Sequence, residues 1–197
     1  VRNAAKYGRV NGALGLMTTD WGDNGHLQPL LSSFPGFVMG AALGWNESSD
    51  LHLESALDLF VFNQPGWGEL ILKIGQLDEP FGITIHNQTI LFQLLRETSD
   101  FIRNCPGLTI DKLETTLEMA HGLQSQFSDL RSKYPINLIL EQEFDWVIKI
   151  LVHACHRGLA ILLEGNEAEL KANAKRLRNQ HELIWSMRNR PGGYELS

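Results

Sequence analysis

The sequence predicts a mainly α-helical protein, a multi-helix bundle that follows one short β-strand. Two observations predict the bundle: apolar residues recur at steps of three and four along several long segments, and the breaks between those segments are brief. A third observation predicts the strand, because only residues 13–20 form a short, mostly apolar run that tolerates extended backbone. We therefore expect a small N-terminal segment attached to a large helical part.

The composition narrows the class of protein. The 197 residues include 23 acidic and 17 basic side chains, which gives a net charge of −6, and 43% are hydrophobic. That apolar fraction is ample for a packed core and too high for a disordered chain. The chain lacks the basic footprint of a nucleic-acid-binding protein, so we expect no nucleic-acid partner. The longest apolar stretch, 138–163, contains five charged residues and predicts a buried helix, with no membrane contact.

The cysteines bear on the cellular compartment of the protein, and the start of the chain bears on whether it belongs to a longer protein. Cys105 and Cys155 lie in apolar contexts without CxxC spacing, which favours a reducing, cytoplasmic compartment. The chain opens at Val1 with no methionine and no signal-peptide segment. We therefore expect it to belong to a longer protein, whose targeting signal, if any, lies upstream.

The predicted strand, residues 13–20, begins after Asn11-Gly12 and ends before Gly22. A lone strand leaves its backbone donors and acceptors unpaired. We expect it to be the end of a sheet whose other strands lie upstream of Val1. The alternatives are that it pairs across a dimer or forms no strand in isolation. Residues 1–20 should therefore be poorly packed, swapped or paired between chains.

Helices account for the rest of the predicted chain, with Pro or Gly at the breaks. Thr109 is expected to cap one long helix, whose apolar stripe runs from Leu113 to Leu130. The next long helix is apolar on most sides, so we expect it to be central. The expected helices span 34–45, a segment from a Ser48–Asp50 cap through Phe60, 67–74, 84–104, 109–131, 138–165 and 167–189.

The densest polar cluster follows the predicted strand and includes Asp20, Trp21, Asp23 and His26. Trp with Asp is typical of sugar recognition, since the indole covers the apolar face of a pyranose and a carboxylate accepts hydrogen bonds from hydroxyls. We therefore predict that these four residues bind substrate. The alternative is a polar turn in which the two aspartates only cap the following helix.

These residues also carry a family resemblance. The run from Gly15 to His26, continuing through Ser32–Asn46, resembles the end of the catalytic barrel in bacterial family 20 glycoside hydrolases, the β-N-acetylhexosaminidases. The segment Leu183–Gly193 resembles the end of the helical C-terminal region that some of these proteins carry. The helices between these two segments match by pattern more than by letter.

The resemblance implies a fold and a division of the chain. Residues 1–46 would be the last β/α unit of an incomplete (β/α)8 barrel, with 12–19 as its eighth strand and 34–45 as its closing helix. Residues 47–197 would be an all-α C-terminal helical domain, and assembly into a homo-oligomer is compatible with this division.

The resemblance also implies an activity, on terminal N-acetylhexosamine residues of carbohydrate, by retaining, substrate-assisted hydrolysis without a cofactor. Trp21-Gly22-Asp23 would occupy the place of the family's Trp-Gly-Glu, with an acid one methylene shorter. The family's catalytic Asp-Glu pair lies on the fourth barrel strand, upstream of this segment. We therefore expect no catalytic residue in this chain, and no glycosidase activity from the chain alone. The alternative function is a non-catalytic helical bundle that serves as an interaction or oligomerisation module.

Two histidine-containing patterns could bind metal. Glu118 and His121 have the spacing of one half of a di-iron site, and His153, Cys155 and His156 lie on the predicted central helix. A di-iron site needs a second such pair and two further glutamates, so we expect no metal site, with the histidines at core or boundary positions and Cys155 as an apolar filler.

The last predicted helix carries His181, Trp185 and Arg188 into a basic segment that ends at Gly193. Either this helix brings the basic segment to a neighbouring surface, or the arginines complement the helix dipole before a Pro-Gly-Gly stop.

Overall fold

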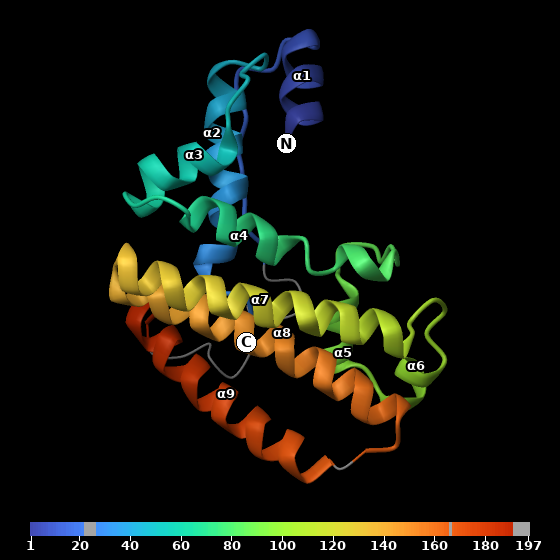
Figure 1. The fold of residues 1–197 in the computed structure, drawn as a ribbon. Helices are drawn as coiled ribbons and strands as arrows, with labels where there is room; N and C mark the ends of the chain where they lie inside the picture. Colours follow the sequence, from blue (N-terminus) through green and yellow to red (C-terminus); the bar gives the residue numbers. More distant parts are fainter. Residues whose placement is uncertain (22–26, 166, 191–197) are drawn as a thin grey trace.

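The computed structural model describes residues 1–21, 27–165 and 167–190, and this part of the chain is mainly helical, as predicted (Figure 1). It contains no β-strand and no helix long and apolar enough to cross a membrane. The α-helices are α1 (Arg2–Val10), α2 (Phe34–Trp45), α3 (Leu53–Leu57), α4 (Trp67–Gly75), α5 (Ile90–Arg96), α6 (Ser99–Arg103), α7 (Ile110–Lys133), α8 (Leu138–Leu162) and α9 (Glu167–Arg188). Shorter turns are the 3₁₀ segments η1 (Leu30–Ser33) and η3 (Glu79–Phe81) and the π-helical segment η2 (Asp58–Phe62).

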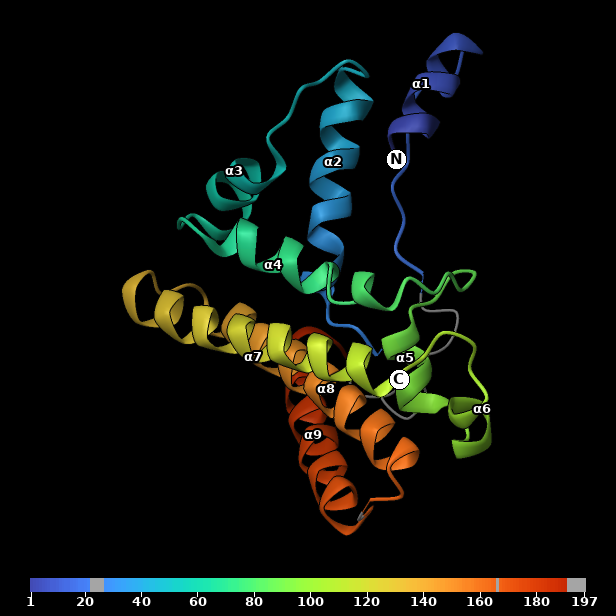
Figure 2. The same cartoon turned by 45° about the vertical axis from the view of Figure 1, so that its right-hand side comes forward.

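Helix α8 is the centre of the bundle, as its sequence predicts. It packs against α7, α9, α5 and α6, and Figure 2 shows α7 and α9 on either side of it. Its apolar residues on several sides are buried, among them Phe144, Val147 and Ile161. Helix α7 presents the predicted one-sided stripe, with Leu113 and Phe127 buried. Burial of these two helices against each other supplies much of the core.

An aromatic cluster joins α4 to the bundle. The ring of Trp67 lies 4.9 Å from that of Phe144 and 5.9 Å from that of Phe127, measured between centroids. The indole Nε1 of Trp67 donates a hydrogen bond to the carbonyl oxygen of Tyr134 at 2.9 Å. Gly68 allows α3 to approach, because a Cβ there would lie 2.2 Å from the carbonyl oxygen of Glu54. Helix α4 therefore links the N-terminal helices to α7 and α8.

Two predicted helix boundaries are wrong because side-chain caps and a turn divide the chain differently. Residues 84–104 form two short helices, and Thr89 and Thr98 accept the backbone N–H bonds that begin them. A turn closed by a bridge between Ile85 and Gln88 precedes α5. The cap of α3 is His52, beyond the expected Ser48–Asp50 segment. Thr109, by contrast, caps α7 as predicted.

The prediction of a strand at residues 13–20 is wrong. This segment is drawn out and irregular in Figure 2, and within the described chain residues 14–19 make no backbone hydrogen bond. Among the described residues no strand lies beside it to form a ladder, so the last β/α unit expected for residues 1–46 lacks its strand. Helix α1, which the sequence analysis did not anticipate, precedes it. As expected, the segment is poorly packed, and Leu14 and Met17 are exposed.

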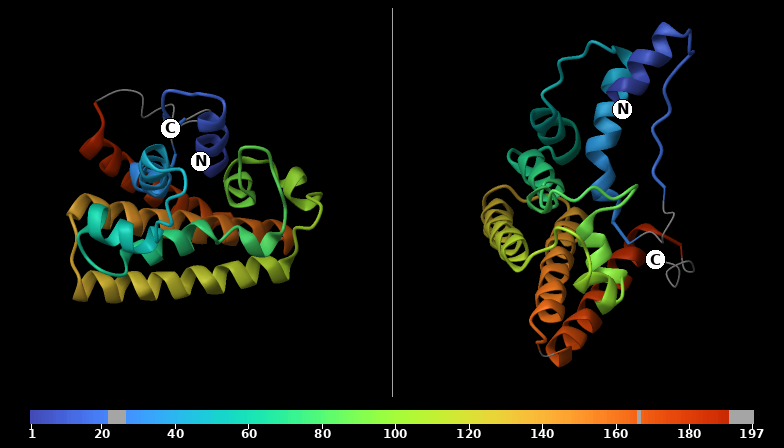
Figure 3. Two further views of the ribbon diagram at one scale, coloured as in Figure 1. Left: turned by 90° about the horizontal axis from the view of Figure 1, so that it is seen from above. Right: turned by 90° about the vertical axis from the view of Figure 1, so that its right-hand side faces the viewer.

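The drawn-out segment nevertheless has one ordered neighbour, helix α2. A Cβ added to Gly40 would lie 2.0 Å from Oγ1 of Thr18, and one added to Gly44 would lie 3.7 Å from Cβ of Leu16. Because residue 16 lies beside residue 44 and residue 18 lies beside residue 40, the segment runs antiparallel to α2. The right-hand view in Figure 3 shows this pair with α1, standing to one side of the α7–α9 bundle.

Candidate functional site

The structure describes two of the four predicted substrate-binding residues, Asp20 and Trp21. Asp23 and His26 lie outside the described residues. Trp21 leaves 72% of its surface exposed, and its indole Nε1 donates a hydrogen bond to Oγ1 of Thr19 at 2.7 Å. Asp20 accepts a hydrogen bond from the hydroxyl of Ser33 at 2.7 Å, which ties the segment to η1. A carboxylate and an exposed indole therefore follow each other in the sequence at the end of the segment.

Two cavities flank this pair. The Trp21 cavity, of about 380 Å³, lies between the segment, the turn before α5, and α8. The Asp20 cavity, of about 440 Å³, lies between the segment and the end of α9. Gln28 and Pro29 line both cavities. The sequence analysis did not single out Gln28, whose place depends on how the segment packs against the bundle.

The Trp21 cavity has an apolar floor and a polar rim. Phe92, Ile150 and Leu151 form part of the floor. The rim includes Gln28, Ser32, Asn87, Gln88 and Thr89. Asn87 adopts a left-handed backbone conformation, with φ of 57°, which asparagine tolerates well. Asn87, Gln88 and Thr89 lie in a stretch that was predicted as helix, so the sequence did not point to them as rim residues.

The Asp20 cavity brings together the two segments that carry the family resemblance. Asp20 lines one side, and His181, Trp185 and Arg188 of α9 line another. The last helix therefore does return to the N-terminal segment, and its arginine does more than complement the helix dipole.

Arg188 forms the main electrostatic feature of the Asp20 cavity. Its Nε and Nη2 atoms pair with the two carboxylate oxygens of Glu143, the second contact at 3.0 Å. The Glu143 side chain is fully buried, with 0% exposure, and the guanidinium is its ion-pair partner. Such fork-to-fork pairs fix orientation as well as charge. The pair holds the last turn of α9 beside Asp20.

His181 is a second buried titratable group of this cavity. Its ring stacks on Trp146 with centroids 4.7 Å apart, and Nε1 of Trp146 donates to the carbonyl oxygen of Leu177 at 2.9 Å. Burial lowers the pKa of His181 and so favours the neutral imidazole. A neutral imidazole can both donate and accept hydrogen bonds.

The chain contains one Asp-Glu dipeptide, Asp78-Glu79, and its setting is structural. The carboxylate of Asp78 accepts the backbone N–H of Leu91 at 3.2 Å, close to the start of α5. Burial raises the pKa of Asp78, and its backbone hydrogen bonds oppose that rise. Neither Asp78 nor Glu79 lines the Trp21 cavity or the Asp20 cavity.

The histidine-containing patterns bring no metal-binding group together among the residues that the structure describes. The rings of His121 and His156 lie 6.5 Å apart, on α7 and α8. Cys155 is fully buried, and desolvation raises the pKa of its thiol to about 12, so it behaves as an apolar filler. His153 is buried as well, at the boundary between α8 and α9.

Comparisons of the chain with models of protein families, with curated proteins and with solved structures found no match.

Lowering the pH is expected to destabilise the fold. Desolvation lowers the pKa values of His153, His156 and His181 in the folded state below the ordinary 6.5. Below that pH the unfolded chain binds these protons first, so stability present at higher pH is lost as the pH falls toward the folded-state values. Each proton of difference contributes a slope of about 1.4 kcal/mol per pH unit. Urea unfolding at a series of pH values measures this.

The control for this measurement uses an exposed histidine. His181→Gln should reduce the slope, whereas His86→Gln, on the exposed turn before α5, should leave it unchanged. Equal slopes in both variants would contradict the assignment to buried histidines.

Proposed function

We propose that the chain is the C-terminal part of a glycoside hydrolase acting on terminal N-acetylhexosamine residues, supplying part of its sugar pocket and a supporting helical domain. The observation that carries this proposal is that the exposed indole of Trp21 and the carboxylate of Asp20, consecutive in the sequence, each line one of two cavities. On this proposal the reaction is retaining and substrate-assisted, and the catalytic Asp-Glu pair comes from the rest of the parent protein.

The chemistry around Trp21 and Asp20 suits a sugar. An indole face covers the apolar C–H face of a pyranose, and its exposure leaves that face open to a ligand. Carboxylates accept hydrogen bonds from hydroxyls and amide groups both donate and accept them, and Asp20, Gln28 and Asn87 line the two cavities. Asp23 and His26 remain proposed members of the same pocket, on the strength of the sequence resemblance.

The barrel part of the proposal concerns the N-terminal segment, which forms no strand within the described chain. The segment runs antiparallel to α2 and packs against its glycines, as a strand does with the helix that follows it in a β/α unit. Residues 14–19 have backbone groups that no described residue pairs, and Leu14, Met17 and Trp45 are exposed nearby. Neighbouring β/α units would pair that backbone and cover those side chains.

The same exposed apolar residues favour a second candidate, a non-catalytic module for interaction or oligomerisation. Tyr7, Val10, Leu14 and Trp45 belong to the part of the molecule that stands away from the bundle. Apolar surface of this kind is typical of an interface with another chain. This candidate predicts self-association of the chain and no affinity for sugars.

Trp21→Ala is expected to weaken binding of N-acetylglucosamine by about fivefold, since stacking on an indole contributes on the order of 1 kcal/mol. Titration with the sugar, followed by NMR chemical shifts, measures the affinity. Trp45→Ala is the matched control, because Trp45 is 90% exposed and lines neither cavity. An equal loss in both variants, or no sugar binding by the unsubstituted chain, would contradict the proposal.

A companion assay tests the expected lack of activity. The chain alone should not turn over a chromogenic N-acetylglucosaminide. Turnover above that of Trp21→Ala would show that a complete catalytic apparatus lies within these residues. Analytical ultracentrifugation of the same samples tests the second candidate, which requires a dimer or larger species.

A further inference from the structure

The groove between α8 and α9 is a second site, apart from Asp20 and Trp21. It has a volume of about 650 Å³. Its polar lining is supplied by all three long helices: Gln124 from α7, Lys149, His153 and His156 from α8, and Glu169, Asn173, Arg176 and Gln180 from α9. Such a concentration of hydrogen-bonding side chains around one cavity is typical of a ligand site.

One buried atom at this groove lacks a partner. Only 7% of the His153 surface is exposed, and its Nδ1 has no hydrogen-bond partner among the described residues. The side chain of Asn173 interacts with the same imidazole and favours its charged form. Buried polar atoms are normally hydrogen-bonded, and an exception in a cavity points to a bound group that completes the bonding.

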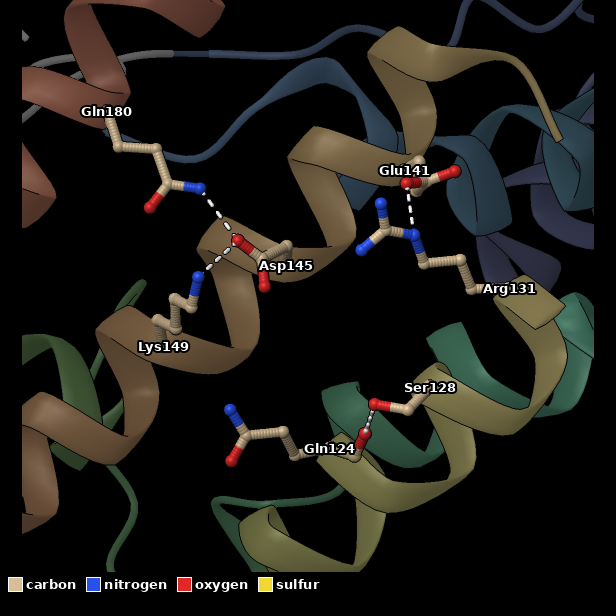
Figure 4. A network of polar contacts seen from close by, with 7 residues as sticks. All are labelled: Gln124, Ser128, Arg131, Glu141, Asp145, Lys149 and Gln180. Carbon is tan, nitrogen blue, oxygen red and sulfur yellow. Dashed lines mark hydrogen bonds and ion pairs between the residues drawn. The ribbon is translucent and has the colours of Figure 1, made fainter. Parts of the chain in front are cut away.

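The acidic side chains of α8 along this face are already neutralised. Figure 4 shows Asp145 accepting from Lys149 and from Gln180, and Arg131 pairing with Glu141. The Lys149–Asp145 contact is 2.5 Å and the Gln180–Asp145 contact is 2.8 Å. These carboxylates therefore add little net negative potential to the groove.

The middle of α9 carries positive charge. Residues 171–178 include Lys171, Lys175, Arg176 and Arg178 and no acidic residue, in a chain whose net charge is −6. Of these four, Arg176 lines the groove, together with the carboxylate of Glu169. Arg176 makes no ion pair with any side chain that the structure describes, so its guanidinium can attract an anion from solution.

We propose that the α8–α9 groove binds a ligand through a tetrahedral oxyanion, a phosphate or sulfate group. Arg176 provides a forked guanidinium for the oxyanion, and the imidazoles of His153 and His156 provide further donors. Gln124, Asn173 and Gln180 supply amide groups for the remainder of the ligand. This proposal does not rest on the sugar pocket, which lies elsewhere on the molecule.

Sulfate is the probe for the test, because its charge is constant across the pH range used. The unsubstituted chain should bind sulfate in NMR titrations at constant ionic strength, and Arg176→Gln should weaken that binding by about tenfold, the loss of one charged hydrogen-bonding partner. Lys175→Gln is the matched control: it removes the same charge from the same helix outside the groove, and it should change the affinity less than twofold. Inorganic phosphate should bind at the same residues, and acetate should bind more weakly.

A pH series adds a readout that general charge attraction does not give. The groups facing the two groove imidazoles are His121 from α7, Lys149 and Arg157 from α8, and Glu169 and Arg176 from α9. Bound sulfate should raise the pKa values of His153 and His156, so affinity should increase as the pH falls from about 7.5 to about 6. Absence of sulfate binding, equal losses in Arg176→Gln and Lys175→Gln, or acetate binding as tightly as sulfate would overturn the proposal.

Discussion

Replacing Arg188 by methionine is expected to lower the free energy of unfolding by about 2–3 kcal/mol, less than for a fully buried ion pair, because 26% of the Arg188 side chain is exposed. The variant would leave the Glu143 carboxylate, which is 0% exposed, without its guanidinium. A buried charge without a partner is far more costly than the pair itself is stabilising, because its hydration has been lost and nothing replaces it. Urea unfolding followed by circular dichroism measures the change.

The control for Arg188→Met is the double variant that also carries Glu143→Leu. With both charges gone, an apolar pair of similar volume should restore most of the stability lost in the single variant. The double-mutant cycle then gives the coupling between the two side chains. A single variant that loses under about 1 kcal/mol, with no coupling in the cycle, would be inconsistent with a buried pair.

The long helices were predictable because their sequence signals are local. Helix α7 has a cap at Thr109 and an apolar stripe of regular period, and both act within the helix itself. Helix α8 could be placed at the centre because its apolar residues leave little polar surface. In both helices local propensity and tertiary packing favour the same structure.

The N-terminal segment was not predictable from local signals. Its apolar, extended-tolerant residues meet the criteria for a strand, but a strand also needs a neighbour, and none is present in the described chain. The prediction of one helix over residues 84–104 was wrong for a different reason. Thr89 and Thr98 cap two separate short helices within a stretch whose apolar residues keep a helical period. The period of the apolar residues alone does not show where one helix ends and the next begins.

The candidate site was predictable only in part. Asp20 and Trp21 stand out because an aromatic and an acid are adjacent in a polar cluster. Glu143 was seen only as a charge that interrupts an apolar helix, and its role depends on Arg188, 45 residues away in the sequence. Pairings of that kind come from tertiary packing, and no spacing rule within one helix gives them.

Trp67→Ala is expected to lower the free energy of unfolding by about 3–5 kcal/mol, as large-to-small substitutions of buried aromatics do. Trp67 is 0% exposed, and its ring contacts Phe62, Phe127 and Phe144. Truncation would open a cavity in that cluster and remove the hydrogen bond that Nε1 donates to the Tyr134 carbonyl oxygen. Thermal and urea unfolding measure the loss.

Trp67→Phe and Trp45→Ala test whether the loss of stability depends on the buried ring of Trp67. Phenylalanine keeps much of the ring contact and should retain part of the stability, whereas Trp45, 90% exposed, should tolerate alanine within about 0.5 kcal/mol. Equal losses in Trp67→Ala and Trp45→Ala would contradict the packing argument. Because α4 packs on α7 and α3 packs on α4, the loss should appear in one cooperative transition. Two separate transitions would instead mean that the N-terminal helices unfold independently of the bundle, in which case Trp67 would stabilise only its own side of the junction.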